Sequence, residues 1–194
     1  MNRSEEITAT RERKTLGFWI YLMTDCILFG SLFATFAVLR GNTFGGPSGA
    51  DLFNLPFVLG ETMILLTSSF TMGLAVLGMA RGYKKQTIVW LIATLLLGAT
   101  FLVMELSEFS HLVADGHGWQ QSAFLSSYFV LVGTHGFHIA VGLLWLAVVG
   151  VRLLKRGFKQ TDMHRLSLLG IFWHFLDVVW IFIFTFVYLI GGMA

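Results

Sequence analysis

The run TIVWLIATLLLGATFLVM, residues 87–104, decides the class of fold to which this sequence belongs. It contains no charged side chain. At a rise of 1.5 Å per residue, a helix of about 20 mostly apolar residues crosses the hydrocarbon core of a bilayer. The run does not alternate apolar and polar residues, as a strand of a membrane β-barrel would. We therefore predict that a membrane-spanning helix covers it.

Four further stretches have the same character, and together the five fill almost the whole chain. Of 194 residues, 56% are hydrophobic and 12% are charged, with a mean hydropathy of +0.75. A soluble domain averages about 25% charged residues, so an ordinary soluble globule, a disordered tail and a nucleic-acid binder are excluded. We predict an all-α integral membrane protein with a tail at residues 1–16 and a five-helix domain at 17–194. Its spans are expected at about 17–40, 56–80, 87–113, 122–151 and 166–191.

The basic residues predict an orientation. Twelve of the 13 Lys and Arg residues lie in the tail or around the connections that follow the second and fourth spans, and only Arg40 lies on the other side. Short loops rich in Lys and Arg remain in the cytoplasm. The expected topology has a cytoplasmic N-terminus and a periplasmic C-terminus. On the periplasmic side, Asn54 before Pro56 is typical of a helix start, and Ser122 is a plausible N-cap after the break at Gly116.

Acidic and histidine residues inside the predicted spans are the candidate functional groups. A charged side chain at the bilayer centre costs about 2.5–3.5 kcal/mol on insertion scales, so each needs a physical reason. Nine residues qualify: Asp25, Glu61, Glu105, Glu108, His111, His135, His138, His174 and Asp177.

These residues divide by their expected depth in the membrane. Asp25 lies about 12 Å from the cytoplasmic end of its helix by the helical rise, and His174 and Asp177 lie at a similar depth. Glu61 and the stripe of Glu105, Glu108 and His111 lie near the outer ends of their helices. His135 and His138, three residues apart on one face, lie between the two sets.

Three interpretations of these groups remain open. In the first, His135, His138 and His174 are axial ligands of haem. In the second, Glu108 and His111 form a Glu-x-x-His motif of a di-metal carboxylate site, which in helix bundles needs a second such motif. In the third, acids and histidines pair across helices, hold the bundle together or touch proton pathways. The residues favour the third. Trp173 and Trp180, seven apart on one face, are interpreted as packing residues.

Two runs of the sequence are specific: FWHFLDVVWIFIFTFVYL (residues 172–189) and VGTHGFHIAVG (132–142). They resemble the last helix of subunit III of the haem-copper respiratory oxidases and the helix before it. GFWIYLMTDCILFGSLFATFAVL (17–39) resembles the helix with the family's buried acid, usually Glu and here Asp25. LPFVLGETMILLTSS (55–69) and MELSEFSHL (104–112) fit the remaining two helices. Longer members have seven helices, and this shorter form most resembles the bacterial cytochrome bo-type ubiquinol oxidases.

The resemblance implies an accessory, non-catalytic subunit in the cytoplasmic (inner) membrane of a bacterium. The complex would oxidise quinol, reduce dioxygen to water and pump protons. No cofactor is expected in this subunit, because the family holds its haems and copper in subunit I. The expected partners are subunit I as the main contact, subunits II and IV, and a phospholipid in a groove between helices. The alternatives are subunit III of a cytochrome c oxidase or nitric oxide reductase-type complex, or an independent membrane haem or metal redox protein.

Overall fold

The computed structural model describes residues 3–45, 49–52, 54–156 and 160–191, and the regular structure in these ranges is helical. The elements in order are α1 (Arg3–Leu39), α2 (Gly49–Leu52), α3 (Leu55–Ala80), α4 (Lys84–Ala114), α5 (Ala123–Arg156), α6 (Gln160–Ile183) and the π-helical η1 (Phe184–Leu189). Five segments are long and apolar enough to cross a membrane: Ala9–Leu39, Leu55–Ala80, Lys84–Ala114, Ala123–Lys155 and Asp162–Leu189. The prediction of an all-helical protein with five such helices is confirmed.

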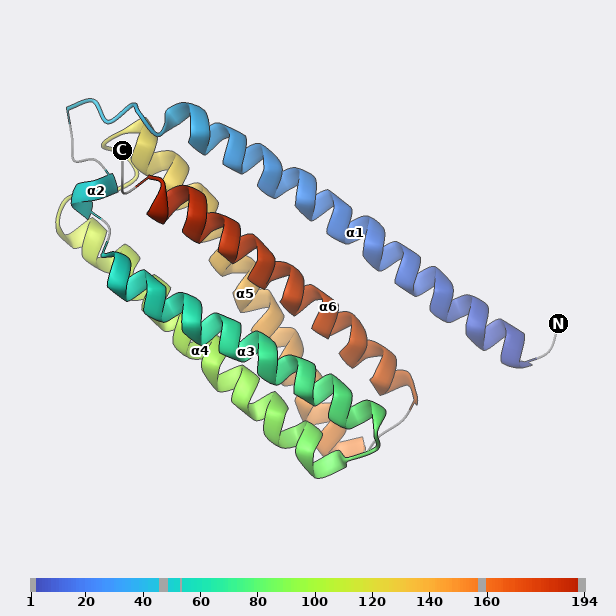
Figure 1. The fold of residues 1–194 in the computed structure, drawn as a ribbon. Helices are drawn as coiled ribbons and strands as arrows, with labels where there is room; N and C mark the ends of the chain where they lie inside the picture. The colour runs from blue at the N-terminus through green and yellow to red at the C-terminus, as the bar shows by residue number, and fades with distance from the viewer. Residues whose placement is uncertain (1–2, 46–48, 53, 157–159, 192–194) are drawn as a thin grey trace.

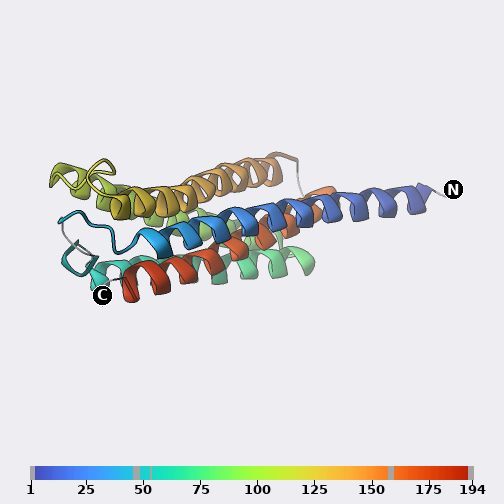
Figure 2. The ribbon, with the colours of Figure 1, turned by 90° about the horizontal axis from the view of Figure 1, so that it is seen from above.

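Four of the long helices form a bundle, and the fifth lies on its outside. Within the bundle α3 packs against α4 and α6, and α5 packs against the same two helices. Helix α1 lies along α5 and α6 (Figure 1), and its N-terminal part extends beyond the other helices (Figure 2). In the most apolar window of each span, 56% of the residues are buried in the last span and 22% in the first. The last span is therefore the centre of the core, and α1 is its periphery.

The ends of the helices follow local signals in the sequence. The Asn54 side chain accepts a hydrogen bond from the backbone N–H of Phe57 at 3.4 Å, and Ser122 Oγ accepts one from Leu125 at 3.1 Å. Both predicted helix starts are confirmed. Helices α3 and α4 each end at a glycine with positive φ, Gly82 (78°) and Gly116 (82°). After α4 the backbone N–H groups of Gly116 and His117 bond to the carbonyls of Val113 and Leu112, which is the Schellman arrangement that glycine favours.

Two helices differ from their expected limits. Helix α1 begins at Arg3, so the predicted tail at residues 1–16 continues the first span as a helix over the part that the structure describes. The last helix, expected at about residues 166–191, changes to π-helix at Phe184, and the backbone N–H of Ile190 bonds to the carbonyl of Thr185. The wider turn rotates the side chains that follow it, and π-helical turns occur often at functional sites.

The core joins α6 to α3 through two tryptophans. Trp173 and Trp180 are almost completely buried, and their indole N–H groups donate to Ser68 Oγ at 3.1 Å and to Thr62 Oγ1 at 3.0 Å. The donors are seven residues apart on one helix, and their acceptors are six apart on the other. Both tryptophans thus pack, as predicted, and they also tie two helices together by hydrogen bonds inside the bilayer.

Candidate functional site

The nine predicted polar residues occupy separate environments in the bundle. The structure contains an aspartate–histidine pair between α1 and α5, a cluster of buried acids between α3 and α4, and a groove between α3 and α6. His111 and His135 lie outside these three environments. The expected depth sets correspond to contacts only in part. Glu61, Glu105 and Glu108 lie together, and so do His174 and Asp177, but Asp25 pairs with His138 on a helix that the sequence could not place beside it.

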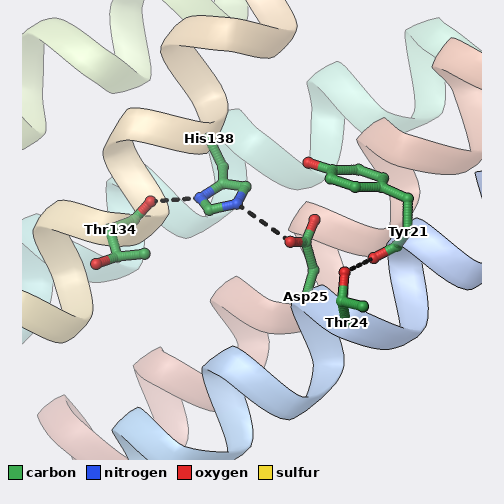
Figure 3. Close-up of polar contacts among 5 residues, drawn as sticks. All are labelled: Tyr21, Thr24, Asp25, Thr134 and His138. Carbon is green, nitrogen blue, oxygen red and sulfur yellow. Dashed lines mark hydrogen bonds and ion pairs between the residues drawn. The ribbon is translucent and has the colours of Figure 1, made fainter.

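Asp25 on α1 faces His138 on α5. Asp25 Oδ1 lies 3.7 Å from His138 Nε2, and only 6% of the Asp25 surface is exposed (Figure 3). His138 Nδ1 lies 2.7 Å from the carbonyl oxygen of Thr134 in the preceding turn. A carbonyl only accepts hydrogen bonds, so Nδ1 carries a proton and Nε2 is the atom turned to the carboxylate. The ring of Phe29 packs 5.2 Å from the imidazole, so the pair is held in an apolar setting.

A double-mutant cycle tests this pair. We expect Asp25→Asn and His138→Gln each to lower the stability of the subunit, and the double variant to lose less than the sum. Residues in direct contact typically show interaction energies of about 0.5–3 kcal/mol. The measurement is thermal unfolding of the purified subunit in mild detergent. As a control, Asp25→Asn combined with Thr67→Val, on a different helix and bonded to its own backbone, should be additive. Additivity of Asp25→Asn with His138→Gln would contradict the pairing.

The acids near the end of the bundle where α3 begins and α4 ends form one cluster with two tyrosines. The hydroxyl of Tyr188 donates to Glu108 Oε2 at 3.1 Å, and the hydroxyl oxygens of Tyr128 and Tyr188 lie 2.9 Å apart. Glu61 on α3 and Glu105 on α4 are within electrostatic reach of Glu108. Both are fully enclosed, with 0% and 1% of their surfaces exposed. The cluster is a buried set of three acids, in which Glu108 accepts a hydrogen bond from Tyr188.

Helix α5 approaches this cluster closely at Gly136. A Cβ atom on Gly136 would lie 2.6 Å from Glu105 Oε1 and 2.8 Å from Oε2, closer than atoms can pack. The carboxyl oxygens of Glu61 and Glu105 have no hydrogen-bond partner within the described ranges. An unpaired buried polar group is costly in an apolar medium, and both ring nitrogens of the buried His135 share this condition within the described ranges.

The two remaining histidines differ in their exposure. His135 is completely buried, and its ring lies 5.2 Å from that of Trp180 and 6.0 Å from that of Phe101. His111 is exposed in the last turn of α4, unlike Glu105, which lies on the same stripe in the sequence and is buried. The described ranges contain no group of three or more His, Cys, Asp or Glu side chains that could hold a metal ion.

The third environment is the groove between α3 and α6. His174 Nδ1 lies 2.7 Å from Ser69 Oγ, and both side chains line the groove together with Asp177. His174 and Asp177 therefore do share a face, as their spacing predicts. The sequence-based set lacks Ser69, Tyr128 and Tyr188, three polar partners that complete these environments. A search for Ser, Thr or Tyr at the depth of each intramembrane acid or histidine would have found them.

Comparison of the sequence with known proteins identifies the family of this chain. Residues 4–192 match the family described as Cytochrome c oxidase subunit III. Cytochrome bo(3) ubiquinol oxidase subunit 3 of Pseudomonas aeruginosa is 56% identical over 177 residues, covering 91% of this chain and 85% of that protein. Quinol oxidase subunit 3 of Bacillus subtilis is 48% identical over 176 residues, covering 91% and 86%. Cytochrome c oxidase subunit 3 of Bacillus sp. (strain PS3) is 46% identical over 184 residues, covering 95% and 89%.

The matches extend over nearly the whole chain and include all five apolar helices. The resemblance seen in the sequence is confirmed, and the protein is a multi-pass membrane protein. The chain belongs to the cytochrome c oxidase subunit III family.

Proposed function

We propose that this chain is the accessory subunit III of a proton-pumping terminal quinol oxidase. The observation that carries the proposal is the 56% identity with the P. aeruginosa subunit over 91% of the chain. The complex would oxidise two quinols for each dioxygen reduced to two waters. A cytochrome c oxidase subunit III is the second candidate, because a relative so named is 46% identical. The higher identity of the ubiquinol oxidase relative favours quinol as the electron donor.

In this proposal the chain itself performs no redox step. Haems and copper belong to subunit I, the main partner, and subunits II and IV complete the complex. The environments of the histidines support a structural assignment. His138 is engaged by Asp25 and by the Thr134 carbonyl, His135 is enclosed by aromatic rings, and His174 is bonded to Ser69. Buried polar groups arranged in this way hold helices in register and support assembly and sustained turnover of the complex.

The proposed orientation has a cytoplasmic N-terminus and a periplasmic C-terminus in the inner membrane of a bacterium. The start of α1, the α3–α4 connection, the end of α5 and the start of α6 lie at one end of the bundle (Figure 1). Lys and Arg concentrate in and next to these parts of the sequence, which supports the assignment of that end to the cytoplasm. In a Cys26→Ala background, an impermeant maleimide should label His117→Cys in spheroplasts and should not label Tyr83→Cys. The reverse labelling would invert the proposed topology.

A phospholipid is proposed in the groove between α1 and α6 near its outer end. The groove has a volume of about 400 Å³, and its floor is apolar apart from Arg40. Its lining residues are Phe33, Ala34, Phe36, Ala37, Arg40, Phe182 and Phe186. The aromatic floor suits an acyl chain, and the guanidinium suits a phosphate at the membrane surface. Arg40→Gln should lower the amount of co-purifying phospholipid, and an unchanged lipid content would remove this site from the proposal.

Affinity purification tests the main proposal. A tagged copy of this chain, isolated from aerobic membranes in mild detergent, should carry a haem-containing oxidase in stoichiometric amount, with higher activity on quinol than on cytochrome c. Asp25→Ala should leave the haem absorbance spectrum of the assembled complex unchanged and should lower assembly or sustained activity, because Asp25 contacts His138 within this subunit. Isolation of the chain without any oxidase, or loss of a haem band in an assembled Asp25→Ala complex, would overturn the proposal.

A further inference from the structure

The groove between α3 and α6 places polar groups on a surface that is otherwise apolar. It has a volume of about 350 Å³. Ser69 on α3 and His174 and Asp177 on α6 form its polar side. Phe70 and Leu77 on α3 stand at its rim, with 66% and 45% of their surfaces exposed. His174 is itself exposed, so the groove presents an imidazole outward from the bundle.

These polar groups lie at the middle of the membrane. The last span runs from Asp162 to Leu189, and His174 and Asp177 are each twelve residues from the nearer end. Twelve residues of helix correspond to about 18 Å, more than half of the roughly 30 Å hydrocarbon thickness. A phospholipid headgroup remains at the surface of the bilayer and cannot reach this depth. A molecule that forms a hydrogen bond with these groups from outside the subunit must therefore carry a polar atom at the middle of the membrane.

The polar groups of the groove differ from other exposed polar residues of the bundle in their hydrogen-bond partners. The exposed hydroxyls of Ser31, Thr67 and Thr100 each donate to a carbonyl of their own helix, so lipid can surround them at little cost. In the groove, Asp177 Oδ1 has no hydrogen-bond partner within the described ranges. His174 has one ring nitrogen bonded to Ser69, and its exposed edge faces outward. Asp177 Oδ1 is itself enclosed, so the polar group that the groove presents outward is the His174 imidazole, at a depth where lipid provides no hydrogen-bond partner.

We propose that this groove receives a transmembrane helix of a partner subunit, one that presents a hydrogen-bonding side chain to His174 at mid-membrane. The inference rests on the proposed function, because it assigns the surface that docks the oxidase. The shape of the groove agrees with a helix as occupant. Ser69 and Gly73 are small residues one turn apart, and a Cβ on Gly73 would meet nothing within 4 Å. Small residues at this spacing let helices approach closely in membranes, and a polar side chain then fixes their register.

Photo-crosslinking in intact membranes tests the surface. A benzophenone amino acid replaces Phe70 at the rim of the groove, and in a separate strain it replaces Leu96 on α4. Leu96 is a matched control, because it is similarly exposed (62% against 66%) and lies at a similar distance from the α3–α4 connection. The probe at position 70 should form an adduct with a transmembrane subunit that also co-purifies with the tagged chain. The probe at position 96 should label mainly lipid.

A second variant links the adduct to the polar groups. His174→Leu in the strain with the probe at position 70 should lower the yield of the protein adduct by up to roughly tenfold, the upper end of the factor expected from the loss of one hydrogen bond. The probe strain itself keeps Asp177 and His174, so its result does not depend on the folding of that variant. Lipid adducts alone at position 70, adducts with a second copy of this chain, or equal yields at positions 70 and 96 would overturn the inference.

The outcomes separate this inference from the proposed function. If the tagged chain carries the oxidase and position 70 labels only lipid, the docking surface is wrong and the proposed function stands. If the chain co-purifies in stoichiometric amount with a different membrane complex and position 70 labels a transmembrane subunit of it, the surface stands and the proposed function fails.

Discussion

Trp180→Ala is expected to destabilise the isolated subunit by about 3–5 kcal/mol, the range for removing a buried aromatic side chain from a close-packed core. Trp180 has 0% of its surface exposed, and its ring meets that of Phe101 edge-on at 4.7 Å. Its indole N–H donates to Thr62 Oγ1 at 3.0 Å. The substitution therefore opens a cavity at the centre of the bundle and removes a hydrogen bond between α6 and α3. Thermal unfolding in mild detergent measures the effect.

Two controls separate cavity formation from the loss of the hydrogen bond. Thr62→Val keeps the packing and leaves the indole N–H without its partner, so it should cost about 1–3 kcal/mol. Trp119→Ala removes a tryptophan that is 54% exposed, and it should change stability by about 0.5 kcal/mol or less. An effect of Trp180→Ala as small as that of Trp119→Ala would contradict the packing of α6 against α3 and α4.

Gly98→Ala is the second substitution with a large expected effect, because α4 passes directly over the indole of Trp173 at this position. A Cβ atom on Gly98 would lie 2.8 Å from two atoms of the Trp173 ring and 3.0 Å from Leu143 Cδ2. The ring cannot move away freely, since it is almost completely buried and bonded to Ser68. Crowding of this kind in a packed core costs about 1–3 kcal/mol. The measurement is again thermal unfolding of the subunit, with assembly into the complex as a second readout.

The position of the clash predicts how it can be relieved. The two crowded atoms belong to the outer edge of the indole, so Trp173→Phe should recover part of the stability lost in Gly98→Ala. Gly60→Ala is the matched control. Gly60 lies within a helix, and a Cβ there would meet nothing within 4 Å, so this substitution should be neutral or slightly stabilising. Equal losses for Gly98→Ala and Gly60→Ala would show that α4 and α6 do not approach as closely as described.

Predictions from sequence were reliable where the physical cause is local. The lengths of the apolar runs predict the spans, because a helix must satisfy its own backbone groups in lipid. Asn54 and Ser122 predict helix starts, because the capping side chain bonds to the backbone three residues later. Gly116 predicts a helix end, because it accepts a positive φ. The family was likewise recognisable from short runs of sequence, and the comparisons confirm it.

The partners of the polar residues could not be predicted in the same way. Depth along a helix follows from the rise per residue, but contact between helices depends on their order and their rotation. Asp25 was grouped by depth with His174 and Asp177, and the structure instead places it against His138 on α5. Tyr188 bonds to Glu108 from a π-helical turn, which no pattern in the sequence predicted.

By itself, the sequence determined that this protein is a five-helix membrane protein with acids and histidines inside the bilayer. Only the tertiary structure decided which of them are enclosed and which face outward. Glu105 and His135 lie inside the bundle, whereas His174, on an equally apolar helix, opens into a surface groove. The reason is that all five helices are apolar on every side, so periodicity does not reveal the inner face. Close packing at positions such as Gly98 and Gly136 sets the rotation of each helix, and with it the environment of every polar side chain.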